Sequence, residues 1–149
     1  RFELSVCLDT TLELIHYEWS PRIEVRRDYG GGLFVEGFPD QLNQAVLNVL
    51  QNAIFSIENQ GEIFISIRQG EEAVVLSIGD TGCGIAESDL PRVFEPFFTT
   101  KEVGKGTGLG LAITYKIVVE NHHGKIDVKP REGGGTEVII TLPLTQPAF

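Results

Sequence analysis

The sequence has few cysteines, few basic residues and no long apolar run, and each shortage excludes a class of protein. Its two cysteines, Cys7 and Cys83, belong to no CxxC pair or Cys/His cluster, so a zinc site is not expected. The 12 Lys and Arg stand against 21 Asp and Glu, and the net charge of −9 argues against binding to nucleic acid or anionic lipid. No apolar run approaches the length of a membrane span, and nothing resembles a signal peptide.

The length of 149 residues fits a single domain, which can bury enough surface to fold without a disulfide or metal staple. Reduced thiols are the default for isolated cysteines, so we expect a cytoplasmic domain, residues 1–149, with no direct membrane contact. The chain opens on Arg1 in mid-pattern, which favours a piece of a longer protein.

The clearest helix signal lies at residues 40–58. One apolar stripe at helical spacing comprises Leu42, Ala45, Val46, Val49, Leu50, Ala53 and Ile57. Gly61 follows as a stop signal. Further helices are predicted over residues 7–18 and 107–121, with a short helical patch near 87–93.

Alternating apolar and polar residues predict the strands. Residues 23–25 and 33–36 read as two strands around a Gly-rich turn, 63–67 and 74–78 as a hairpin, and 125–129 and 136–142 as a final pair. Because the order lacks a strict βαβ rhythm, we expect an α+β fold. It is a two-layer α/β sandwich, with a mixed, mostly antiparallel sheet covered on one face by helices.

Two asparagines are the first candidate site residues. Asn48 and Asn52 lie four residues apart on the predicted helix, so they share a face at the edge of its apolar stripe. An amide oxygen is a neutral hard ligand suited to Mg²⁺, which also takes oxygens from phosphates. Taken alone, such a pair is more often simply solvated.

The segment Asp80–Ile85, which reads DTGCGI, follows directly on a predicted strand. A carboxylate at a strand end, followed by two glycines, can approach a flat ligand closely and accept a hydrogen bond from an exocyclic amine such as that of adenine. The alternative is a tight turn, which Asp and Gly often form.

The segment Gly104–Leu111 places four alternating glycines at the start of a predicted helix, where free N–H groups and the helix dipole favour an anion. The spacing fits neither a Walker A loop nor a dinucleotide fingerprint. A flexible linker is the alternative. Before it, the loop 94–101 carries three phenylalanines, which are expected to dock on the core or on another domain.

The order of these motifs resembles that of sensor histidine kinases. The N, G1, F, G2 and G3 boxes of that family correspond to Asn48…Asn52-Ala53, DTGCGI at 80–85, FEPFFTTK at 94–101, GTGLGL at 106–111 and GGGT at 133–136. The resemblance covers about residues 40–142 and implies the Bergerat ATP-binding fold. Gyrase, mismatch-repair and chaperone ATPases of the same superfamily resemble the FEPFFTTK and GTGLGLAI strings much less.

The resemblance implies ATP and Mg²⁺ as ligands. Asn52 would hold the metal with Asn48 beside it, and Asp80 would accept from the adenine amine. Lys101 and Lys105 would reach the phosphates from an ATP lid at about 95–106. The other implied nucleotide-binding residues are Gly82, Gly84, Ile85, Gly104, Gly106, Thr107, Gly108, Leu109, Gly110, Leu111 and Thr136, the last supporting Asp80.

The implied reaction is transfer of the γ-phosphoryl group of ATP to a histidine on an adjoining dimerisation domain of the same protein, with a response regulator downstream. Hydrolysing relatives carry a Glu where this chain has Asn48, so slow ATP hydrolysis is expected. Three alternatives remain: an ATPase or ATP-gated clamp, a nucleotide-sensing module without phosphotransfer, and an anti-sigma-type serine kinase.

The chain also departs from the family pattern. Phe55 stands where many members place a polar or basic residue facing the nucleotide. No histidine-bearing dimerisation helix is present. His16 is expected to pack beside Trp19, and His122–His123 to end a helix where cations suit the dipole, so neither is read as a phosphoacceptor.

Overall fold

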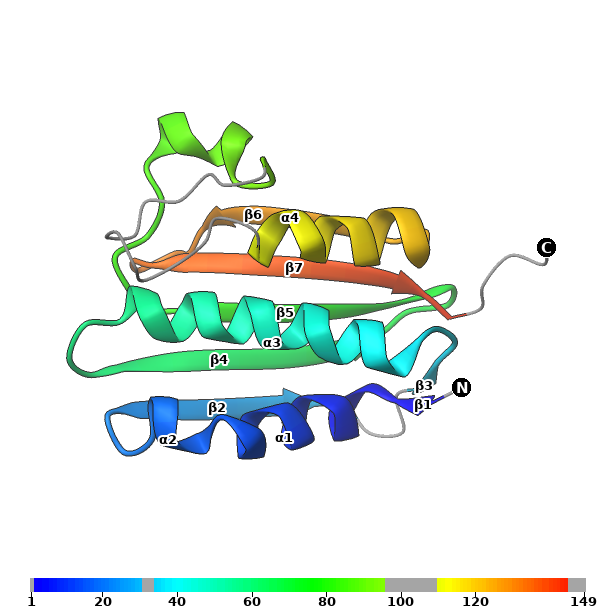
Figure 1. The fold of residues 1–149 in the computed structure, drawn as a ribbon, viewed down its shortest axis with the longest axis horizontal. Coiled ribbons are helices and arrows are strands. Elements are labelled where there is room, and N and C mark those ends of the chain that lie inside the picture. Colours follow the sequence, from blue (N-terminus) through cyan, green and yellow to red (C-terminus); the bar gives the residue numbers. More distant parts are fainter. Residues whose placement is uncertain (1, 31–33, 96–109, 145–149) are drawn as a thin grey trace.

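The computed structural model describes residues 2–30, 34–95 and 110–144, which form two layers (Figure 1). The strands are β1 (Phe2–Glu3), β2 (Ile23–Tyr29), β3 (Phe34–Val35), β4 (Gly61–Gln69), β5 (Ala73–Asp80), β6 (Lys125–Pro130) and β7 (Thr136–Pro143). The helices are α1 (Leu4–Leu14), α2 (His16–Trp19), α3 (Pro39–Ser56), the 3-10 helix η1 (Glu87–Arg92), α4 (Gly110–Tyr115) and the π-helix η2 (Lys116–Asn121).

The main sheet has five strands in the order β2-β4-β5-β7-β6, and only β2 and β4 pair in parallel. Helices α1, α3 and α4 lie on one face of this sheet (Figure 1). The expected α+β sandwich, with a mixed, mostly antiparallel sheet, is therefore confirmed. The hairpins β4–β5 and β6–β7 are also as predicted.

The core lies between the sheet and α3. Alternate side chains of β4 point toward the helices and are buried, as Ile63, Ile65 and Ile67 show with exposures of 0, 1 and 0%. Residues between them, such as Phe64 and Ser66, are half-buried on the other face. Alternating burial of this kind follows from the two-residue period of a strand.

The predicted pairing of residues 23–25 with 33–36 is wrong. β3 pairs with β1 instead, and β2 runs parallel to β4. The reason is topological, because a parallel pair needs a crossover connection and α3 supplies it between β2 and β4.

Two helix boundaries also differ from the sequence prediction. The predicted helix 7–18 is interrupted at Ile15, whose φ of −107° and ψ of 18° leave the helical region between α1 and α2. Helix α3 ends at Ser56, because Ile57 turns to extended backbone with its side chain buried, so Gly61 opens β4 and does not stop the helix. Within residues 2–30, 34–95 and 110–144, none of the helices has the length and apolar character that a bilayer crossing requires.

Candidate functional site

Asp80 is the last residue of the buried strand β5, and it is 6% exposed. Its Oδ1 accepts a hydrogen bond from the backbone N–H of Gly82 at 2.8 Å and from the Ser56 hydroxyl at 3.2 Å. The last turn of α3 therefore faces the segment that follows β5. A buried acidic group held in this way is a recognised mark of a functional site.

Burial raises the pKa of the Asp80 carboxyl above its ordinary value of 3.8. Hydrogen bonds from Gly82, Ser56 and the main chain of Thr136 act in the opposite direction on that pKa, and so does the positive charge of Arg131. Together these groups offset only part of the cost of burying the charged carboxylate. A ligand that donates a further N–H to this carboxylate would stabilise its charged form.

Three glycines allow the backbone to close around Asp80. A Cβ at Gly82 would lie 2.6 Å from the carbonyl oxygen of Ser56, and one at Gly135 would overlap the carbonyl oxygen of Asp80. Gly84 and Gly135 have φ values of +75° and +93°, which favour glycine. The DTGCGI segment, the end of α3 and the β6–β7 loop consequently meet without intervening side chains.

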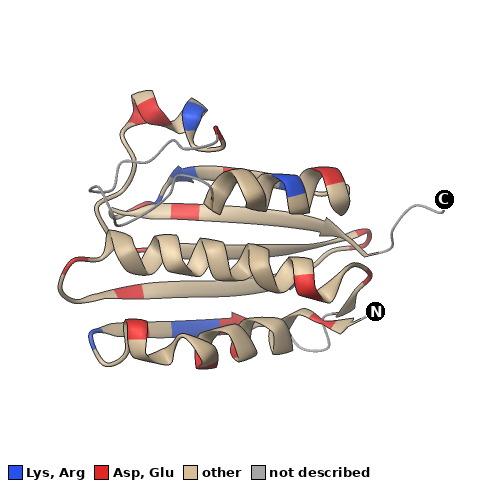
Figure 2. Cartoon of the chain, in the orientation of Figure 1, with Lys and Arg blue, Asp and Glu red and all other residues tan. Residues whose placement is uncertain are grey.

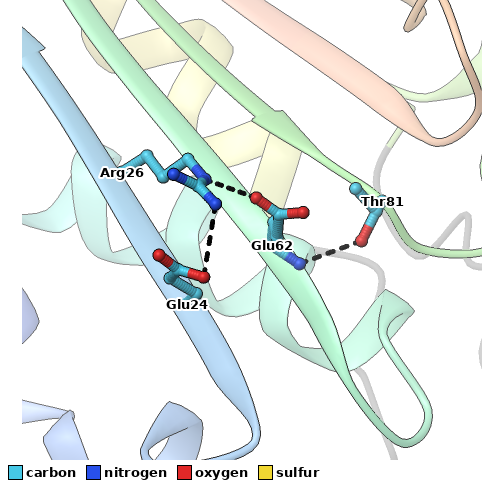
Figure 3. Close-up of polar contacts among 4 residues, drawn as sticks. All are labelled: Glu24, Arg26, Glu62 and Thr81. Carbon is cyan, nitrogen blue, oxygen red and sulfur yellow. Dashed lines mark hydrogen bonds and ion pairs between the residues drawn. The ribbon is translucent and has the colours of Figure 1, made fainter.

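Thr81 ties the segment after Asp80 to the start of β4. Its N–H donates to the carbonyl oxygen of Glu62 at 3.2 Å, and its hydroxyl accepts from the Glu62 N–H at 3.0 Å. The Glu62 carboxylate pairs with Arg26 on β2, which also contacts Glu24 (Figure 3). The ion pairs are exposed and contribute little stability, whereas the backbone contacts fix where β5 ends.

Asn48 joins α3 to α4. Its Nδ2 donates to the carbonyl oxygen of Gly110 at 3.2 Å and lies 3.4 Å from the Thr114 hydroxyl, while its Oδ1 accepts from Gln44 at 2.8 Å. Asn52 lies one turn further along, with its Nδ2 3.8 Å from where a side chain on Gly110 would begin. The structure therefore brings both asparagines together with the first described residue of α4.

The helix that carries these two amides, α3, has little charge of its own. Asp40, near the start of α3, is the only charged residue on that helix (Figure 2). Phe55, on the same helix, is 49% exposed.

The remaining described residues of the predicted nucleotide site are buried to different degrees. Ile85 and Leu111 are partly buried against the core, and Thr136 is 7% exposed at the start of β7.

Part of the predicted site lies outside the described residues. This applies to Lys101, Gly104, Lys105, Gly106, Thr107, Gly108 and Leu109. Of the phenylalanines in the loop 94–101, Phe94 is described, and it packs against the core with its ring 5.3 Å from that of Tyr115.

Sequence reasoning missed Ser56 and Arg131, and it named Gly135 only within the GGGT segment at 133–136, without linking it to Asp80. Ser56 could have been found, because it follows Asn52 by four residues and so shares its helix face. No sequence spacing connects Gly135 or Arg131 to Asp80, because the antiparallel pairing of β5 with β7 brings them together.

His122 follows directly on η2, so the second helix ends there as predicted. His122 is fully buried; its Nε2 accepts from the Phe38 N–H at 2.9 Å and its Nδ1 lies 2.8 Å from the carbonyl oxygen of Ile117. Through these two contacts His122 joins the end of η2 to the start of α3. His16 is exposed, although its ring lies 4.8 Å from that of Trp19.

Comparison with known proteins agrees with this geometry. The family model described as histidine kinase-, DNA gyrase B- and HSP90-like ATPase matches residues 37–146. Sporulation kinase E of Bacillus subtilis (strain 168) is 47% identical over 111 residues, which are 74% of this chain and 15% of that protein. The chain therefore spans a small part of the length of this relative.

Solved structures agree as well. The catalytic domain of the histidine kinase ThkA is 32% identical with a TM-score of 0.87, and the match covers 97% of this chain and 96% of that one. ThkA in complex with the response regulator protein TrrA matches with 29% identity and a TM-score of 0.84, over 97% of this chain and 41% of that one.

Proposed function

Because the chain belongs to the histidine kinase-, DNA gyrase B- and HSP90-like ATPases, and within them resembles the catalytic domains of sensor histidine kinases, we propose that residues 1–149 form one ATP-binding catalytic domain. It transfers the γ-phosphoryl group of Mg-ATP to a histidine on an adjoining dimerisation domain of the same protein. The observation that carries the proposal is the buried carboxylate of Asp80, whose surroundings match an adenine site.

Adenine fits the groups around Asp80. Its exocyclic amine can donate to the carboxylate, and a hydrogen bond to a charged group is worth about 1.5–3 kcal/mol. Gly82 and Gly84 offer backbone without side chains on one side, and Ile85 offers apolar surface for the flat ring. A purine with an oxygen in place of the amine would instead set a carbonyl oxygen against the carboxylate.

The phosphates would lie toward the asparagines of α3. Asn52 supplies an amide oxygen suited to Mg²⁺, and Asn48 lies beside it. When held there, the ion would help to neutralise the charge of the phosphates. Because α3 carries no acidic side chain beyond Asp40, it does not repel a polyphosphate. Lys101, Lys105 and the glycines of 104–110 remain predicted phosphate contacts.

The environment of Asn48 favours transfer over hydrolysis. Both ends of its side-chain amide are already hydrogen-bonded, to α4 and to Gln44, and an amide is a poor base for activating water. Phosphoryl transfer then depends mainly on positioning and charge neutralisation. A response regulator would receive the phosphate next, as the complex of ThkA with TrrA suggests for a relative.

Phosphotransfer is tested by incubating the chain with γ-³²P-labelled Mg-ATP and the histidine-bearing dimerisation domain of the same protein. We expect label on that domain that is lost in acid and retained in alkali, as for phosphohistidine, and none with Asp80→Asn. Without the acceptor domain, phosphate release should be slow. Acid-stable label, or rapid phosphate release that Asn48→Ala abolishes, would contradict the proposal.

A further inference from the structure

The loop between β6 and β7 contacts the main chain of Asp80 and contains three consecutive glycines with positive φ. Gly133, Gly134 and Gly135 have φ values of +91°, +112° and +93°. Consecutive glycines have little intrinsic preference for one conformation, so the loop needs contacts that hold it in place. Two backbone hydrogen bonds do part of this, from the Arg131 N–H to Gly135 and from the Gly134 N–H to Arg131, each 3.0 Å long.

The side chain of Arg131 supplies a further anchor. Its guanidinium carbon lies 4.4 Å from the centroid of the Phe64 ring on β4, and its Nη1 donates to the carbonyl oxygen of Gly134 at 3.1 Å. Between the two lies Gly79 on β5, where a Cβ would come within 3.3 Å of the Arg131 Cδ. Gly79 pairs with Phe64 in the sheet, so the arginine crosses β5 where a side chain is missing.

The anchored loop reaches Asp80 through two contacts. Gly135 packs so closely on the main chain of Asp80 that any side chain there would overlap its carbonyl oxygen. The main chain of Thr136, the next residue, lies near the Asp80 carboxylate and lowers its pKa. The charge of Arg131 also favours the ionised carboxylate. Loosening the anchor would therefore disturb both the position and the charge of Asp80.

We propose that Arg131 is a positioning residue for base recognition, which holds the β6–β7 loop against Asp80 and thereby sets the preference for adenine over 6-oxopurines. This inference rests on the proposed ATP-binding function. Arg131 touches the loop and Phe64, and it acts on the nucleotide through Asp80. A merely structural brace would affect the binding of every nucleotide equally, whereas a positioning residue affects the nucleotide with the 6-amino group most.

The test uses Arg131→Met, which keeps an unbranched apolar side chain and removes the guanidinium. The dissociation constants of ATP and inosine triphosphate, which carries a 6-oxo group, are measured by calorimetry on chains shown to be folded by urea unfolding. We expect the ATP constant to rise about tenfold and that of inosine triphosphate to change less than about twofold, since a charged hydrogen bond is weakened. Arg68→Met is the matched control, because Arg68 pairs with Asp28 at the opposite end of β4.

A second variant, Phe64→Leu, removes the aromatic platform and leaves the arginine in place. It should lower the ATP preference in the same direction by a smaller factor, and the double variant should lose no more than Arg131→Met alone. Equal losses for both nucleotides, or an unchanged ratio in both variants, would refute the positioning role and leave ATP binding intact. A folded native chain that does not bind ATP would overturn the proposed function together with this inference.

Discussion

Replacing Gly82 by alanine should weaken nucleotide binding, because there is no room for the added methyl group. The new Cβ would lie 2.6 Å from the Ser56 carbonyl oxygen and closer still to its hydroxyl, where ordinary contact begins at 3.4 Å. Neither neighbour can retreat easily, since Ser56 ends α3 and its carbonyl oxygen accepts from the Cys83 N–H at 3.0 Å. The segment after Asp80 must therefore move away from α3.

That movement breaks the 2.8 Å hydrogen bond from the Gly82 N–H to Asp80. Overpacking of this kind costs about 1–3 kcal/mol. Displacing the carboxylate also removes the adenine contact, worth about 1.5–3 kcal/mol, so the dissociation constant of ATP should rise about 10- to 100-fold.

Calorimetry measures the ATP affinity of Gly82→Ala, and urea unfolding measures its stability. Gly70→Ala is the matched control, because a Cβ there would meet only the Ala73 carbonyl oxygen at an ordinary 3.5 Å and Gly70 does not have a left-handed φ. The control should keep the native ATP affinity. A Gly82→Ala chain that also keeps it would refute the reasoning about the close approach of α3 to Asp80.

Three further predictions concern other groups of the molecule. Asp80→Asn should raise the free energy of unfolding at pH 7. Burial raises the pKa of the native carboxyl, so the stability of the native chain falls as the pH rises above 3.8. Urea unfolding from pH 4 to 7 should therefore show a widening difference in free energy of unfolding between Asp80→Asn and the native chain. Asn48→Ala should cost about 1–2 kcal/mol in the same assay, because it removes the hydrogen bonds that join α3 to α4. A thiol reagent at pH 7 should label exposed Cys83 quickly and Cys7 only after unfolding, because burial raises the pKa of the Cys7 thiol to about 11. Equal labelling rates of the two cysteines in the folded chain would contradict this.

Local patterns were sufficient for the elements that carry the site. The apolar stripe of α3 predicted its extent within a few residues and placed Asn48 and Asn52 at its margin, because helical period and burial agree there. The alternation in β4 and β5 likewise predicted their hairpin and put Asp80 at its end. In each case the signal lies within one or two neighbouring elements.

Contacts between distant segments could not be predicted in the same way. β3 pairs with β1 and not with β2, and the apolar periodicity of a strand does not show which of two possible partners it pairs with. His122 gave the signal of an exposed helix end, yet the approach of α3 buried it against Phe38. The role of Gly135 arises only from the pairing of β5 with β7, since its turn-forming composition would look the same in any hairpin loop.

ATP binding at Asp80 is tested most directly by titrating the folded native chain and Asp80→Asn with ATP in a calorimeter, with and without Mg²⁺. The native chain should show saturable binding at one site, tighter with the metal. The substitution should weaken that binding at least about tenfold, since an amide cannot offer the adenine amine a charged acceptor. A folded native chain without saturable binding, or equal affinities in both chains, would contradict the assignment of Asp80 as the adenine acceptor.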